Sequence, residues 1–190
     1  LSRLAEQGTF QTIVTAFPST TGPAYLPFIT GQFPGSCNIP GIRWFDKAAY
    51  AQKGWGFGQF RSYVGFETRF LDGDINPHVK TAWEIFDRPK NILNGVCRGL
   101  PPRGDLTRRS RGPSYLLGHF TRCWKLVDHI AYKKLLNVAQ SGDFDFVFCV
   151  FPGVDEYAHR GSPFDARVRK TYAQVDKYLG DVVQVLKNKG

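Results

Sequence analysis

The sequence predicts an α/β fold with a mostly parallel sheet and helices on both faces of that sheet. Two observations predict it: apolar runs typical of buried strands alternate with long segments whose apolar residues recur at helical spacing. A stretch in which glycines and aromatic residues alternate interrupts this pattern and indicates an irregular, cap-like insertion. We therefore expect core α/β structure over residues 1–46 and 113–190 and the insertion over residues 47–112, all within one domain.

The beginning of the chain predicts a helix, a strand and a second helix. Leu1–Gly8 has the pattern of the end of a helix, which the glycine stops. The β-branched and apolar run Phe10–Phe17 predicts a strand. A turn over residues 18–23 then leads into a helix at Ala24–Ile29, which ends at Gly31.

The middle of the chain predicts little regular structure. Residues 33–75 fit a loop or cap, and the aromatics of Gly54–Phe60 either stack on a base or pack on the domain. Trp83–Phe86 predicts a short helix, and Ile92–Val96 predicts a short strand. Pro101–Pro113 is a predicted loop that holds four arginines: Arg103, Arg108, Arg109 and Arg111.

The last third of the chain predicts a helix, a buried parallel strand and a second long helix. Apolar positions at helical spacing place the first helix over Trp124–Gln140, ended by Gly142. Phe144–Phe151 is continuously apolar apart from Asp145, as strands buried on both faces are. Val168–Lys187 again has apolar residues on one helical face.

The composition is that of a globular protein. Of the 190 residues, 42% are hydrophobic and 15% aromatic, which excludes a disordered chain. The longest apolar stretch, Phe144–Val154, is too short to cross a bilayer, which takes ~20 residues. The four cysteines form no Cys-x-x-Cys pair, which argues against a zinc ribbon and a dithiol redox centre.

The net charge of +9 has two interpretations. Clustered basic residues release counterions from phosphates and so suit nucleic acid. A solvated basic surface, or a site for small anionic substrates, is the plainer interpretation, and charge alone favours it.

A turn rich in hydroxyls, Phe17–Pro23, is the first candidate site. It precedes a predicted helix, whose free N–H groups and positive dipole end attract anions. A hydroxyl held there suits attack on phosphorus. The alternative is a plain capping turn in which Thr21 caps the helix, a common role for threonine.

The second candidate site directly follows the predicted buried strand, where ligands of open α/β sheets bind. Asp155 and His159 are four residues apart, so one helical turn aims both side chains at one point. A carboxylate with an imidazole suits zinc or a similar divalent ion. A surface aspartate beside a capping histidine is the alternative.

Three segments carry a resemblance to a known family. Phe17–Pro23, followed by Thr30-Gly31, has the form of a nucleophile segment, and Val154–Pro163 contains an Asp-x-x-x-His motif with a trailing Gly and Pro. The opening Leu-Ser-Arg-Leu-Ala-Glu-Gln-Gly fits the helix after a first metal-ligand loop. Together they resemble the alkaline phosphatase superfamily, in its type I phosphodiesterase/nucleotide pyrophosphatase branch, which implies an alkaline-phosphatase-like core.

The resemblance also implies an activity, namely metal-dependent hydrolysis of phosphodiester or pyrophosphate bonds in a small phosphorylated substrate. Thr21 is then the nucleophile, forms a phospho-threonine intermediate and is a ligand of one metal ion. Asp155 and His159 bind the other of two divalent ions, and zinc is the expected metal.

The chain departs from the branch in two places. Arg43-Trp44 stands where the branch has a phosphate-binding asparagine, so we expect Arg43 and Trp44 to bind substrate, unless Arg43 pairs with Asp46 on the surface. The remaining metal ligands would fall before Leu1 and after Gly190. The resemblance therefore implies a fragment, with one nucleophile and half of one metal site.

Two other functions stay open. A phosphomonoesterase or phosphomutase of the same superfamily is indicated if Arg43 contacts a terminal phosphate. A non-catalytic basic module would bind anions or nucleic acid, although nucleic acid is otherwise not an expected partner. The sequence leaves the oligomeric state open, and it gives only a lean toward a cytoplasmic location.

Overall fold

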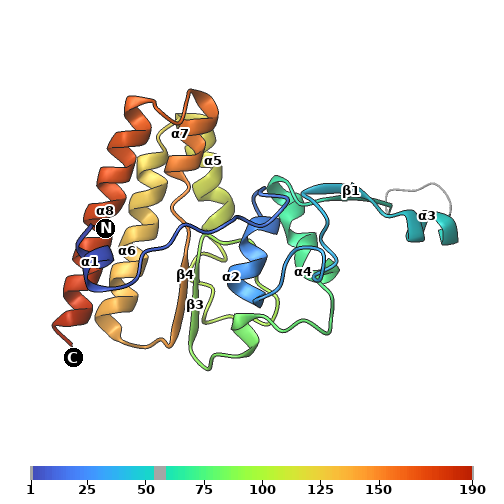
Figure 1. Cartoon of the computed structure of the whole chain (residues 1–190), viewed down its shortest axis with the longest axis horizontal. Coiled ribbons are helices and arrows are strands. Elements are labelled where there is room, and N and C mark those ends of the chain that lie inside the picture. The colour runs from blue at the N-terminus through green and yellow to red at the C-terminus, as the bar shows by residue number, and fades with distance from the viewer. Residues whose placement is uncertain (1, 54–58, 190) are drawn as a thin grey trace. The chain divides into compact units, whose positions relative to one another are not determined.

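The structure, a computed structural model, describes residues 2–53 and 59–189 (Figure 1). The chain divides into two compact units, which we describe separately. The first unit holds Leu1–Thr12, Arg88–Asn94 and Pro101–Gly190, and the second holds Ile13–Asp87 and Gly95–Leu100.

A parallel strand pair lies in the first unit. β3 (Pro89–Ile92) and β4 (Phe146–Cys149) align residue for residue over their whole length. Parallel strands need a long crossover, which α5 (Arg111–Thr121) and α6 (Trp124–Ser141) supply here. The α/β class is thus confirmed as a mixed structure. The described residues form two sheets of two strands each, and a larger parallel sheet stays a prediction.

Long helices in the first unit run side by side (Figure 1). α6 packs along α8 (Ala166–Lys187), where the rings of Tyr132 and Tyr178 stack with centroids 4.0 Å apart. The Tyr132 hydroxyl donates to Asp181 Oδ2 at 2.9 Å, and His129 Nδ1 lies 3.1 Å from the Tyr178 hydroxyl. His129 therefore belongs to the contact between these two helices.

The core of the first unit centres on Trp124, which is wholly buried at the start of α6. A Cβ added to Gly118 of α5 would lie 2.6 Å from the Trp124 ring, so only glycine fits there. Residues from both strands and from the helices complete this core: Ile92, Leu93, Val127, Ala131, Cys149, Tyr157 and Val168. The strand pair is thereby fixed to α6, to α8 and to α7 (Gly153–Arg160).

The second unit is built from short elements. Gly31, at φ 66°, ends its first α-helix as predicted, and β1 pairs with β2 in antiparallel orientation. Trp83 is buried and donates its indole N–H to the Val96 carbonyl at 3.0 Å. The elements are η1 (Pro23–Tyr25), α2 (Leu26–Thr30), β1 (Arg43–Phe45), α3 (Lys47–Lys53), β2 (Phe60–Ser62), η3 (Gly65–Phe70), α4 (Leu71–Asp74) and η4 (Ala82–Glu84).

Several predicted elements are confirmed. The helices at the start and in the last third are present as α1 (Ser2–Gln7), α6 and α8, and the 3₁₀ helix η4 takes the place of the predicted Trp83–Phe86 helix. The predicted strand Phe144–Phe151 is present in shorter form as β4. Most of the Gly- and aromatic-rich run Gly54–Phe60 lies outside the described residues.

Three predictions were wrong. Phe10–Phe17 forms no strand: Val14 is 94% exposed, and no described strand lies beside it to share hydrogen bonds. The strand predicted at Ile92–Val96 lies earlier, as β3, because Leu93 has a φ of 62° and leaves the extended conformation. The predicted loop Pro101–Pro113 ends where α5 begins, at Arg111.

In the part of the chain that the structure describes, every helix is too short or too polar to pass through a lipid bilayer.

Candidate active site

The hydroxyl-rich turn exposes Thr21 to solvent in the second unit. The turn is closed by backbone bonds: Ala24 N–H donates to the Thr20 carbonyl at 2.9 Å, and Tyr25 N–H donates to the Gly22 carbonyl at 3.0 Å. Gly22, at φ 89°, is the residue that precedes η1, and its neighbour Pro23 begins that helix. No described residue forms a hydrogen bond with the Thr21 hydroxyl, so Thr21 does not cap η1 and its oxygen is available for chemistry.

Arg43 and Trp44 begin β1 in the same unit. Arg43 is exposed and pairs with no described acidic side chain, because Asp46 lies instead 3.7 Å from Arg61 Nη2. The surface pair of Arg43 with Asp46 is therefore not formed, and the Arg43 guanidinium is free to bind an anion. Trp44 donates its indole N–H to the Tyr63 hydroxyl at 3.1 Å, which fixes its ring.

Asp155 and His159 lie on α7 in the first unit, one helical turn apart. Asp155 Oδ1 is 3.3 Å from His159 Nε2, and the two side chains are 64% and 75% exposed. The spacing thus brings the two side chains together as predicted. α7 begins four residues after β4 ends, so the pair follows the carboxyl end of a parallel strand.

A buried carboxylate supports the start of α7. Asp128 on α6 is 1% exposed, and its Oδ1 accepts the Gly153 N–H, the first of this helix, at 3.0 Å. Burial raises the pKa of Asp128 to about 6, and the Gly153 hydrogen bond opposes this shift. A Cβ on Gly153 would lie only 2.1 Å from Asp128 Oδ2, so the close approach requires glycine.

Sequence reasoning missed Asp128. The only local signal is a charged residue next to Val127 and one turn from Ala131, both buried on α6. Its partner lies 25 residues further along the chain, where no spacing rule reaches. Burial, and to a smaller extent the nearby charge of Asp128, raises the pKa of Cys149 to about 12, so its thiol stays protonated.

The donor set of α7 fits part of a metal site. A carboxylate oxygen and an imidazole nitrogen are ligands that zinc accepts, and both side chains reach solvent. Over residues 2–53 and 59–189 no group of three or more His, Cys, Asp or Glu side chains is placed to hold an ion. Asp155 and His159 therefore have the chemistry of two metal ligands, without a third beside them among the described residues.

Comparison with known proteins identifies the family. The sequence model of the family "Type I phosphodiesterase / nucleotide pyrophosphatase" matches residues 1–190. No curated protein and no solved structure gives a match. The matched range includes the hydroxyl-rich turn around Thr21, the Arg43-Trp44 pair and α7. The chain therefore belongs to the type I phosphodiesterase/nucleotide pyrophosphatase family and is a hydrolase of that kind.

Proposed function

We propose that this hydrolase cleaves phosphodiester or pyrophosphate bonds of a small substrate, with Thr21 as the nucleophile. The observation that carries the proposal is the Asp155–His159 pair on α7, 3.3 Å apart, in a chain that matches the family from end to end. The exposed Thr21 hydroxyl, with no described partner, supports its assigned role.

The reaction at Thr21 proceeds in two displacements. In the first, Thr21 Oγ1 attacks phosphorus in line, the bond from phosphorus to the leaving oxygen breaks, and the hydroxyl proton goes to solvent or to the leaving group. In the second, water attacks the phosphorus of the phospho-threonine, the bond from phosphorus to Thr21 Oγ1 breaks, a proton returns to Oγ1 and the phosphate product leaves. Splitting the hydrolysis into two easier steps is the advantage of a covalent intermediate.

Asp155 and His159 would hold one of two divalent ions, and zinc suits their donor atoms. Such an ion, when bound, acts as a Lewis acid that neutralises charge on phosphate oxygens. The protein's contribution is to keep both proposed ligands on one face of α7. Tyr157 supports that face from behind, because it is buried in the core of the first unit.

Arg43 would bind phosphate oxygens, since its guanidinium can form two parallel hydrogen bonds with them. Arg43 is exposed and has no acidic partner among the described residues, which favours a second candidate function, a phosphomonoesterase or phosphomutase that binds a terminal phosphate. Trp44, beside it on β1, would contact the substrate's organic part.

The fold implied by the family completes the proposal. In it, β3 and β4 belong to a larger parallel sheet of an alkaline-phosphatase-like core. The cap-like insertion expected over residues 47–112 is then interrupted by β3 (Pro89–Ile92), which pairs with β4 of that core.

The test is hydrolysis of bis-p-nitrophenyl phosphate against p-nitrophenyl phosphate. We expect the diester to be the faster substrate, and we expect its hydrolysis to fail in Thr21→Ala and after chelation. If Arg43 binds phosphate in general, Arg43→Gln should slow hydrolysis of both substrates. If Arg43 binds a terminal phosphate, it should slow hydrolysis of the monoester only. Full activity in Thr21→Ala together with full activity in chelator would refute the mechanism.

A further inference from the structure

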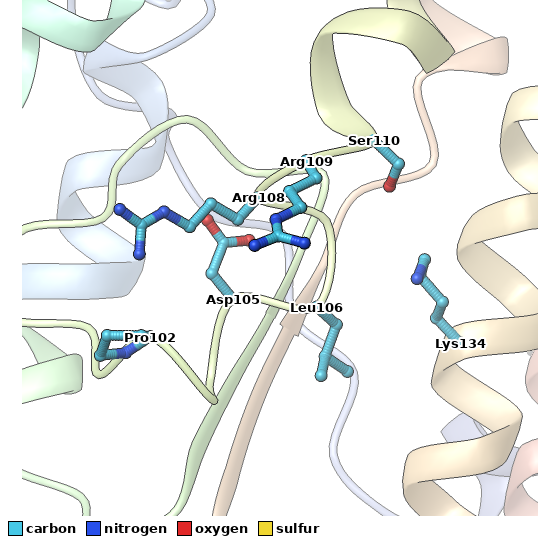
Figure 2. A pocket seen from close by; sticks show the side chains of 7 residues that line it. All are labelled: Pro102, Asp105, Leu106, Arg108, Arg109, Ser110 and Lys134. Carbon is cyan, nitrogen blue, oxygen red and sulfur yellow. The ribbon is translucent and has the colours of Figure 1, made fainter.

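A basic pocket of about 680 Å³ opens in the first unit at the beginning of α5 (Figure 2). Arg108, Arg109 and Ser110 line it from the segment before the helix, and Lys134 lines it from α6. Neither Thr21 nor the Asp155–His159 pair is among its lining residues. The pocket is therefore distinct from the residues to which we assign hydrolysis.

Its charge balance favours an anion. Asp105 is the one carboxylate among the lining residues, and its Oδ2 is held by Arg111 Nη2 at 2.6 Å. Asp105 is thus neutralised by an arginine that does not line the pocket. Arg108, Arg109 and Lys134 pair with no acidic side chain in the described part of the chain, so their three positive charges remain uncompensated.

The Ser110 hydroxyl is a second, independent observation. Ser110 precedes α5 at the position where a serine side chain ordinarily caps the helix, yet it forms no capping bond. Its Oγ has almost no solvent contact and no hydrogen-bond partner among the described residues. Figure 2 shows the Ser110 hydroxyl directed from the beginning of α5 toward the side of the pocket on which Lys134 lies. An oxyanion bound in the pocket would give this hydroxyl a partner after a small rotation of the serine.

We propose that this pocket binds a phosphate group, carried either as inorganic phosphate or as a small phosphate monoester. Two guanidinium groups and an ammonium match the charge and the several acceptor oxygens of a phosphate. The volume lies in the range of small-ligand pockets, whereas a nucleic-acid strand needs an extended basic track. Leu106 adds an apolar wall that suits the organic part of a monoester.

Hydrolysis of a phosphodiester leaves a phosphate monoester, so the protein itself generates ligands of this class. The fraction of protein with an occupied pocket would therefore rise with the concentration of the product. This step depends on the family activity and not on the identity of the nucleophile.

The test is calorimetric titration of the purified protein, in chelator, with inorganic phosphate and with a nucleoside monophosphate. We expect Arg109→Gln and Lys134→Gln each to weaken phosphate binding about tenfold. Ser110→Ala should weaken it by about threefold. Stronger binding of the nucleotide than of inorganic phosphate would identify a monoester as the ligand, and equal binding would identify phosphate alone.

Two matched controls carry the same change of charge. Arg103→Gln lies in the same loop and Lys133→Gln lies next to Lys134 on α6, and neither residue lines the pocket. Both should bind phosphate as the unaltered protein does.

The proposal is overturned by any of three results. The first is no phosphate binding at millimolar concentration in a protein whose circular dichroism is native. The second is equal weakening in the control and pocket variants, which would mean general surface attraction. The third is tighter, strongly salt-dependent binding of long single-stranded nucleic acid that the pocket variants do not affect.

Discussion

The two segments that carry the predicted chemistry are supported very differently. α7, with Asp155 and His159, has a core behind it: Tyr157 is 5% exposed, and Asp128 accepts the first N–H of the helix. The turn around Thr21 has backbone hydrogen bonds and a three-residue 3₁₀ helix after it, and Phe17 on its approach is 92% exposed.

This difference indicates where substitutions affect folding and where they affect chemistry. Asp155 or His159, the proposed ligands on α7, can be replaced at little cost in stability, because both side chains are exposed. A change beneath α7 reaches the core and lowers stability. Thr21 itself is exposed, whereas Gly22 and Pro23 beside it are buried, so truncation of the Thr21 side chain should be tolerated without loss of fold.

The largest expected effect is on metal affinity and activity. His159→Ala removes one of two donors on α7 and should weaken zinc binding, measured by competition with a chromophoric chelator, at least about 100-fold. The free energy of unfolding in urea should stay within about 0.5 kcal/mol of the original value, since His159 is 75% exposed.

Arg160→Ala is the matched control for His159→Ala. Arg160 is the next residue of α7 and lies 4.0 Å from Glu156 Oε2 in a half-buried pair of modest energy. Unchanged zinc affinity in His159→Ala, or an equal loss in Arg160→Ala, would contradict the assignment of His159 as a ligand.

The next effect in size is on the packing beneath α7. Gly153→Ala places a methyl group where Asp128 Oδ2 now lies, so the carboxylate must move and the Gly153 hydrogen bond is lost. We expect a loss of about 2 kcal/mol, because overpacking outweighs the better helix propensity of alanine.

Gly180→Ala tests the opposite case. Gly180 lies within α8, and a Cβ there would meet no atom within 4 Å apart from its own helix backbone and chain neighbours, so alanine should stabilise the protein by about 1 kcal/mol. The comparison is made by urea unfolding of both variants. Equal shifts in the same direction would show that the contact with Asp128 is not what constrains position 153.

Asp128→Asn should change how stability depends on pH. The folded-state pKa of Asp128, about 6, is above the ordinary value, so its ionisation between about pH 4 and pH 6 lowers the stability of the fold. Asparagine keeps the acceptor for Gly153 and does not ionise. Relative to the original protein, the variant should gain on the order of 2–3 kcal/mol between pH 4 and pH 7.

The measurement is the difference in unfolding free energy between the two proteins at each pH. A difference that stays flat from pH 4 to pH 7 would show that folding does not raise the pKa of Asp128. Asp128→Ala, which has no acceptor, should be less stable than Asp128→Asn at every pH.

The helices of the last third could be predicted because their signal is local. Apolar residues at helical spacing identify α6 and α8, and the four-residue separation of Asp155 and His159 brings their side chains together on α7. The family match likewise confirms a resemblance that rested on short motifs.

What could not be predicted depends on partners distant in sequence. The run Phe10–Phe17 has strand propensity but no described strand beside it, and propensity alone does not form a sheet. The beginning of α5 could not be predicted, because Arg111-Gly112-Pro113 has the composition of a loop. Proline is nevertheless tolerated in the first turn of a helix. Asp128 acts on a residue 25 positions away.

The smallest expected effect concerns the cap of α8. The Asp165 carboxylate accepts a hydrogen bond from the Arg167 guanidinium at 2.9 Å and another from the Arg167 backbone N–H at 2.7 Å. These bonds lower the pKa of Asp165 to about 2. Because this pKa is depressed, the stabilisation is present above about pH 4 and is lost as the pH falls toward 2. Asp165→Ala should therefore lower the thermal midpoint at pH 7 and leave it nearly unchanged at pH 2. An equal reduction at both pH values would show that the cap of α8 depends on the Asp165 side chain but not on its charge.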